Sequence, residues 1–298
     1  MLSRKSPAPV IFGCSDYSLT PEEKAFFNTH QPLGFILFKR NIHDKAQLKA
    51  LIEELKAIVN HKNPPILIDQ EGGRVARLTP PHWDAHPPMR VDLTKESLEG
   101  AKARIHKTYS HIAKDLREVG ITVNCAPVLD IDVPGADDIM GDRTFNTDPQ
   151  VVSVLGAIAI QALEEGGVIP VMKHIPGHGA ATCDSHKVLP VVDLSLKDLE
   201  PHFAPFKANA ACPWAMTAHI IYSALDPHRP ATQSPVIIQD IIRGQLGFKG
   251  FLVSDDLGMN ALSGSFAERA RKSLEAGCDA VLHCSGLLNE MTDVMKGI

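Results

Sequence analysis

The chain has 298 residues, of which 44% are hydrophobic, and this length suits one large α/β barrel or two smaller domains. A formal net charge of −5 and a pI of about 6.3 argue against a nucleic-acid or anionic-membrane partner, because either needs a clustered basic surface. The longest early apolar stretch, Ala8 to Phe12, is interrupted by Pro9 and is too short for a signal segment or a membrane span.

Short apolar runs rich in Val and Ile recur along the chain and alternate with helical patterns. Near-continuous apolar runs of this length predict strands that are buried on both faces, as in a parallel sheet. There are eight such runs, in chain order Val10–Phe12, Phe35–Phe38, Ile66–Ile68, Thr122–Ala126, Val168–Met172, Trp214–Thr217, Phe251–Ser254 and Ala280–His283.

The segments between these runs carry the signals of helices. Residues 20–23 combine a capping threonine, a proline at the first helical position and a glutamate at the capping-box position. Asp44 and Gln47 repeat this pattern ahead of a leucine and isoleucine stripe with i, i+3, i+4 spacing. Ser195 and Ser234 mark the starts of two later helices.

Eight strand-then-helix units predict an α/β fold, a single (β/α)8 barrel of the TIM type, rather than an open sheet. We expect residues 1–298 to form one catalytic domain whose last helix is short or truncated, since only residues 286–298 follow the final run. The six cysteines include no C-x-x-C pair, which predicts free thiols, no structural zinc site and a cytoplasmic location.

Polar side chains follow six of the predicted strands, where (β/α)8 barrels hold their catalytic groups. Because an unpaired buried charge is costly, such a ring predicts a site for a small polar ligand. Its members are Asp69, Glu71, Asp130, Arg143, Lys173, His174, His219, Asp255, Asp256 and His283. Some of them also have structural interpretations: Asp255 or Asp256 as a turn cap, and Lys173 as a buried ion-pair partner of Asp130 or Asp255.

The segment after the fifth strand, KHIPGHGAATCDSH, holds a second signal. Asp184 and His186 are two residues apart on an irregular loop, which places a carboxylate within possible reach of an imidazole. Such a carboxylate orients the ring and favours its protonated form, so the pair suits general acid–base catalysis near neutral pH.

At these residues the sequence resembles glycoside hydrolase family 3, and within it the compact bacterial β-N-acetylglucosaminidases that recycle cell-wall fragments. The resemblance runs from about residue 10 to about residue 285, and three residues depart from the family pattern without removing a reacting group: Asp142, Ile175 and Gly258. The matching segments are IDQEGGRVARL (68–78), APVLDI (126–131), GDRTF (141–145), KHIPGHG with DSH (173–186) and VSDDLGM (253–259).

The resemblance implies a role for each matching residue. Asp255 would be the nucleophile of a retaining hydrolysis, with His186 as general acid/base and Asp184 as its partner. Four residues would hold the sugar hydroxyls and a fifth, Arg77, would line the same pocket; the four are Asp69, Arg143, Lys173 and His174. The expected substrate is a small carbohydrate, a muropeptide of the N-acetylglucosaminyl-anhydromuramyl type, and the expected enzyme is a cytoplasmic monomer without metal or cofactor.

Three other functions remain open at this point. A metal-dependent barrel hydrolase would use ligands from His174, His178, His186, His219 and Asp255, although no H-x-H follows the first strand. A Schiff-base aldolase would use the amine of Lys173. A non-catalytic sugar-binding barrel would leave the reacting groups without a chemical role.

Overall fold

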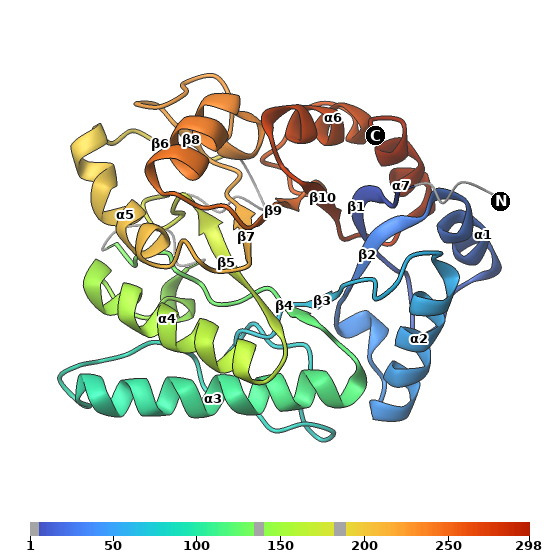
Figure 1. The fold of residues 1–298 in the computed structure, drawn as a ribbon, viewed down its shortest axis with the longest axis horizontal. Coiled ribbons are helices and arrows are strands. Elements are labelled where there is room, and N and C mark those ends of the chain that lie inside the picture. The colour runs from blue at the N-terminus through green and yellow to red at the C-terminus, as the bar shows by residue number, and fades with distance from the viewer. Residues whose placement is uncertain (1–5, 134–139, 182–188) are drawn as a thin grey trace.

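The computed structural model describes residues 6–133, 140–181 and 189–298. Eight parallel strands close into a barrel in the order β1-β10-β9-β7-β5-β4-β3-β2 (Figure 1). The first and last strands meet directly, with Val10 opposite Val281. The barrel strands are β1 (Ala8–Gly13), β2 (Pro32–Leu37), β3 (Ile66–Ile68), β4 (Val123–Asn124), β5 (Ile169–Ile175), β7 (Trp214–Thr217), β9 (Phe251–Asp256) and β10 (Ala280–His283).

All eight predicted strands are confirmed, but three of them end later than predicted, β1 by one residue and β5 and β9 by more. β5 continues to Ile175 and β9 to Asp256, so Lys173, His174 and Asp255 lie within strands rather than beyond them. The ladder of neighbouring strands therefore fixes the backbone of these polar residues.

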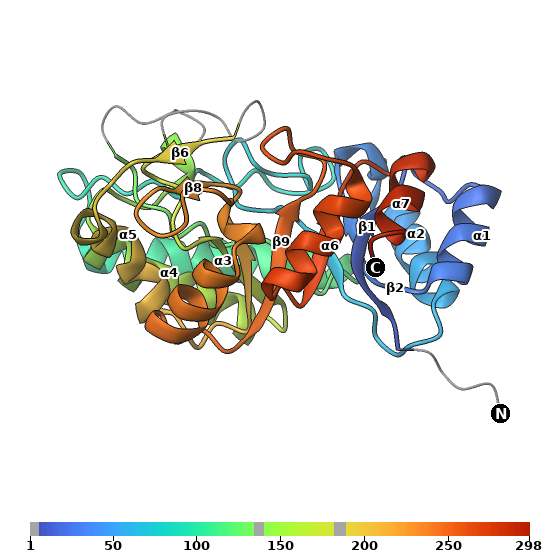
Figure 2. The same cartoon turned by 90° about the horizontal axis from the view of Figure 1, so that it is seen from above.

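Helices surround the barrel, one after each strand (Figure 1). They are α1 (Pro21–His30), α2 (Lys45–Ile58), α3 (Leu98–Val119), α4 (Pro149–Glu165), α5 (Leu196–Ala208), the π-helix η4 (Ile237–Gln245), α6 (Phe266–Ala276) and α7 (Leu288–Met295). The short elements are η1 (Lys39–Asn41), η2 (Gly141–Arg143), η3 (Ala231–Gln233) and the paired strands β6 (Val191–Val192) and β8 (Ile221–Tyr222). In the side view of Figure 2, β6 lies near the upper end of the molecule.

The predicted helix starts are formed by the expected side chains. The Thr20 hydroxyl accepts from the Glu23 N–H at 3.1 Å and the Glu23 carboxylate accepts from the Thr20 N–H at 2.9 Å, which completes the capping box. Asp44 caps α2 and Ser195 caps α5 with the side-chain oxygen alone, which accepts from the N–H of Gln47 and of Asp198 respectively. No helix in the described residues combines the length and apolar character needed to cross a bilayer.

The barrel interior is filled by one inward-facing side chain set, which includes Ile36, Leu67, Val171 and Val253. Because successive residues of a strand point to opposite faces, the residue two positions later faces inward as well. From Leu67 this rule leads to Asp69, from Val171 to Lys173, and from Val253 to Asp255. Inward-facing positions therefore hold apolar residues in the barrel core and polar residues at the C-terminal strand ends.

Candidate active site

A cavity of about 430 Å³ opens at the C-terminal ends of the strands. It is lined by every described residue that was expected to act in the site, namely Asp69, Arg77, Arg143, Lys173, His174 and Asp255. The remaining two, Asp184 and His186, lie outside the described residues. Side chains far apart in the sequence therefore meet in one pocket, as the strand-end pattern predicted.

Lys173 lies between two carboxylates on the cavity floor. Its Nζ atom is 2.9 Å from Asp69 Oδ1 and 2.7 Å from Glu71 Oε1. Arg143 binds Glu71 through two nitrogens, with Nη2 at 2.8 Å and Nε at 2.9 Å, and Arg77 Nη2 is 3.2 Å from Asp69 Oδ2. These five residues form one charge-compensated network, since each carboxylate contacts two cations.

The suggestion that Lys173 pairs with Asp130 or Asp255 was wrong. Its partners, Asp69 and Glu71, lie just after β3, and Asp69 is 104 positions away in the sequence. Lys173 and Asp69 lie side by side because each stands two positions after an inward-facing residue of its strand.

The network sets the protonation states of its members. Burial raises the pKa of Glu71, but the charges of Lys173 and Arg143 outweigh it and lower that pKa to about 2. Asp69 is affected likewise: burial opposes ionisation, and Lys173 and Arg77 still hold its pKa below the ordinary value. The two carboxylates in turn raise the pKa of Lys173 against the effect of burial. A permanently protonated amine does not fit the Schiff-base alternative.

Asp255 occupies a different environment within the same cavity. Burial raises its pKa, but the imidazoles of His174 and His219 and the N–H of Asp256 have the larger effect and lower it. The N–H of Asp256 donates to Asp255 Oδ1 at 2.8 Å. Asp255 is therefore an ionised carboxylate on the wall of the pocket, fixed within β9.

Asp256 is the member of the pair that caps the following turn. Its Oδ1 accepts from the N–H of Gly258 at 2.9 Å and from the N–H of Cys284 at 3.0 Å. The sequence left open which aspartate has this structural role, and the hydrogen bonds assign it to Asp256.

Asp130 orients His174 from the segment after β4. Its carboxylate, fully buried, accepts from His174 Nδ1 at 2.7 Å and from the backbone N–H of His178 at 2.6 Å. With Nδ1 bound in this way, His174 has its Nε2 atom free to face a ligand. The sequence pattern included Asp130 but assigned it no role.

Arg40 and Phe38 line the cavity and were missed by the sequence analysis. The Arg40 guanidinium donates to the carbonyl of Cys14 at 3.0 Å and to that of Cys284, and it lies 4.8 Å from the centre of the Phe38 ring. Phe38 directly follows β2 and Arg40 lies two residues later in η1, so an examination of the segment after this strand would have found them.

The described residues do not favour the metal-dependent alternative. Among them, no group of three or more His, Cys, Asp and Glu side chains is placed to hold a metal ion. His219 is committed to protein atoms, with Nδ1 at 2.7 Å from Thr232 Oγ1 and Nε2 at 3.0 Å from the Asp256 carbonyl. Neither of its ring nitrogens is available to a metal in this arrangement.

Comparison with known proteins agrees with this geometry. The glycosyl hydrolase family 3 N-terminal domain matches residues 16–298. The chain belongs to glycoside hydrolase family 3. A β-hexosaminidase of Thiobacillus denitrificans is 41% identical to this family 3 chain over 261 residues, which cover 85% of the chain and 71% of that protein.

Solved structures of NagZ from Neisseria gonorrhoeae share the fold. Its complex with N-trifluoroacetyl-D-glucosamine superimposes with a TM-score of 0.89 at 35% identity and covers 97% of this family 3 chain and 84% of that chain. Its complex with a zinc ion gives a TM-score of 0.85 at 34% identity, covering 93% and 81%.

Proposed function

We propose that this family 3 enzyme is a retaining exo-β-N-acetylhexosaminidase that releases terminal β-linked N-acetylglucosamine. Asp255 attacks the anomeric carbon as the bond to the leaving group breaks, and water then hydrolyses the glycosyl-aspartate with overall retention. One observation carries this proposal: Asp255 is a partly buried, ionised carboxylate fixed in β9 that lines the cavity beside the charged network around Lys173.

The proton donor is proposed to be His186, held in its acidic form by Asp184. Asp69 and Glu71 are unsuitable acids, because their neighbouring cations keep them ionised at neutral pH. Burial lowers the pKa of His178 to about 4, so this imidazole is also a poor proton donor. A histidine acid/base becomes neutral after donation and can then take a proton from the attacking water.

The charged network is proposed to hold the sugar hydroxyls. Asp69 and Arg77 can grip a diol through charge-assisted hydrogen bonds, and His174 offers its Nε2 atom. Lys173 and Arg143 complete the set and keep the carboxylates ionised. These contacts orient the anomeric carbon toward Asp255.

The substrate class is proposed from the relatives. Those at 35–41% identity are named β-hexosaminidases, and a structural neighbour holds an N-acylated glucosamine analogue. We propose muropeptides of the N-acetylglucosaminyl-anhydromuramyl type as natural substrates, with the enzyme acting as a monomer in the cytoplasm. Recovery of the mature protein mainly from periplasmic or secreted fractions would contradict this location.

Two measurements test the proposed reaction. The purified protein should hydrolyse 4-nitrophenyl N-acetyl-β-glucosaminide, whereas a non-catalytic sugar-binding barrel would only bind it. Proton NMR during the first minutes should show the β-anomer of N-acetylglucosamine ahead of the α-anomer. Early appearance of the α-anomer would indicate an inverting enzyme and exclude the glycosyl-aspartate.

The metal-dependent alternative is tested by chelation. Protein treated with EDTA and desalted should keep its full rate, because the proposed chemistry uses a carboxylate and an imidazole only. A rate that disappears on chelation and returns with zinc would favour the metal-dependent reaction.

A further inference from the structure

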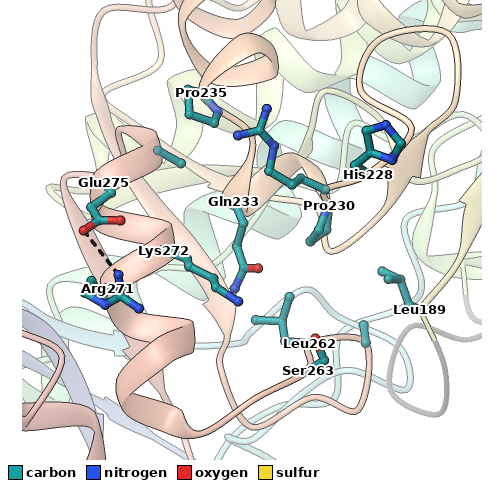
Figure 3. Close-up of a pocket in the computed structure, with 13 residues that line it drawn as sticks. Leu189, His228, Pro230, Gln233, Pro235, Leu262, Ser263, Arg271, Lys272 and Glu275 are labelled. Atoms are coloured by element: carbon teal, nitrogen blue, oxygen red, sulfur yellow. Dashed lines mark ion pairs between the residues drawn. The ribbon is translucent and has the colours of Figure 1, made fainter.

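A second cavity, of about 510 Å³, lies next to the proposed sugar pocket (Figure 3). Its described walls come mainly from residues 228–235 ahead of η4, residues 261–263 after β9, and residues 271–276 of α6. The segment after β9 connects the two cavities, since Met259 lines the sugar pocket and Ala261 lines the second cavity. Two residues of chain span at most about 7 Å, so the two cavities are neighbours.

The lining of the second cavity is cationic, although the chain as a whole carries a net charge of −5. Its described residues include Arg229, Arg271, Lys272 and one carboxylate, Glu275. Arg229 Nε pairs with the buried carboxylate of Asp226 at 2.9 Å, so the surplus of positive charge comes from Arg271 and Lys272. Arg271 lies 3.6 Å from Glu275 with both side chains more than half exposed, and an exposed pair of this kind is weak. The surplus of positive charge in a concave surface favours an anionic ligand.

Gln233 adds a neutral donor to these cations. Its Nε2 atom is buried and has no hydrogen-bond partner in the described part of the protein. Figure 3 shows the side chains of Gln233 and Lys272 reaching into the cavity from different walls. A buried amide nitrogen without a partner is costly, and an acceptor oxygen from a ligand would relieve that cost.

The second cavity is linked along the chain to the proposed acid/base. Leu189 is the first described residue after the segment that carries the proposed acid/base, and it lines this cavity. Since a general acid must face the oxygen of the leaving group, this closeness in sequence favours the aglycone side as the place of the second cavity.

We propose that the second cavity is an aglycone subsite that binds a carboxylate of a peptide carried by the leaving group. Lys272 and Gln233 Nε2 donate hydrogen bonds to the carboxylate, and Arg271 supplies further positive charge. This inference rests on the proposed function, because it assigns the part of the substrate beyond the scissile bond. It predicts that the enzyme distinguishes acidic from amidated glycopeptides.

The test compares three substrates in which N-acetylglucosamine is the sugar released. The first is 4-nitrophenyl N-acetyl-β-glucosaminide, the second carries a muramyl-type sugar with a short peptide bearing free carboxylates, and the third is the same glycopeptide with carboxamides. The variants are Lys272→Gln and the double variant Arg271→Gln/Lys272→Gln. Lys107→Gln, an equal charge change on an exposed residue of the distant helix α3, is the matched control.

The wild-type protein should hydrolyse the carboxylate glycopeptide with a higher kcat/KM than the carboxamide. Loss of each cation should reduce the ratio of these two kcat/KM values by about threefold to fivefold, which is the effect of one partly exposed ion pair. Added salt should reduce the same ratio in the wild type, because it screens the charges. Lys107→Gln should leave the ratio unchanged.

The subsite would be overturned if the protein hydrolyses the aryl glycoside but the ratio of kcat/KM for the carboxylate glycopeptide to that for the carboxamide is near one in the wild type. The same ratio in the wild type and in all variants would also overturn it. Failure of the wild-type protein to hydrolyse the aryl glycoside would instead overturn the proposed function itself.

Discussion

At the scale of single residues, the two aspartates at the end of β9 differ only in their neighbours. Both line the cavity, but Asp256 accepts two backbone hydrogen bonds and caps a turn, whereas His174 and His219 lower the pKa of Asp255 against the effect of burial. Identical side chains therefore acquire separate roles from the groups that surround them. A sequence shows that one of the two is structural, but the hydrogen bonds are needed to tell which.

His186→Ala tests the proposed acid/base. The rate should fall by about 10²- to 10⁴-fold for poor leaving groups, which need protonation, and much less for activated aryl leaving groups. Asp184→Asn should shift the basic limb of the pH profile to lower pH, because the protonated imidazole loses its anionic partner. Steady-state kinetics with a series of aryl glycosides gives both results.

Glu71 is the rival acid in this experiment. An equal loss for good and poor leaving groups in His186→Ala, with the leaving-group dependence appearing in Glu71→Gln, would favour the carboxylate.

Lys173→Met tests the buried charge network. The substitution leaves Asp69 and Glu71 without their shared cation, and breaking a buried pair in this way costs about 3–5 kcal/mol of unfolding free energy. Lys24→Met is the control, because Lys24 pairs with Glu54 at 2.6 Å on the surface and its loss costs about 0–1 kcal/mol. Similar urea midpoints for the two variants would show that the network contributes little to stability.

At the scale of elements, the segment after β4 positions the imidazole of His174 on β5 through Asp130. Asp130→Asn replaces a charged acceptor of the His174 and His178 N–H groups with a neutral one. Since a hydrogen bond to a charged group contributes about 1.5–3 kcal/mol, kcat/KM should fall by roughly 10- to 100-fold.

Asp132→Asn is the matched control for this junction. Asp132 lies two residues later and pairs with Arg90 at 2.6 Å, with both side chains partly exposed. Its variant should keep nearly the full kcat/KM, and an equal loss in both variants would remove the special role of Asp130.

The sequence predicted the elements well because buried strands of a parallel barrel are apolar along their length. It placed the ends of β5 and β9 too early, because the polar residues there point into a cavity where other strands compensate their charges. The partners of Lys173 could not be predicted, since they depend on which strand lies beside which. Arg40 could have been predicted, because it is a charged residue shortly after the apolar strand β2.

At the scale of the whole molecule, the barrel closes through parallel pairing of β1 with β10, and α7 packs against α1 and α6. Eight strand ends then meet at one face, and residues from β3, β5 and β9 share one pocket. The active site thus depends on closure of the whole barrel rather than on any single unit.

The buried network also makes stability depend on pH. The pKa of Glu71 is lowered from 4.5 to about 2, so its contribution is complete above pH 4.5 and is lost as the pH falls toward 2. Over that window the stability difference between the wild type and Glu71→Gln should shrink by up to about 1.4 kcal/mol per pH unit. Urea unfolding of both proteins at pH 7, 4.5 and 3 measures this difference in unfolding free energy. A difference that stays the same at all three pH values would contradict the ionised state assigned to Glu71.

Covalent trapping tests the proposed nucleophile most directly. A fluorinated N-acetylglucosaminyl donor that forms the glycosyl-enzyme faster than water hydrolyses it should add one sugar to the protein, and peptide mass spectrometry should locate that sugar on Asp255. Asp255→Ala should keep the fold, by circular dichroism, and lose both the label and turnover. A label on Asp256, or full turnover in Asp255→Ala, would contradict the mechanism.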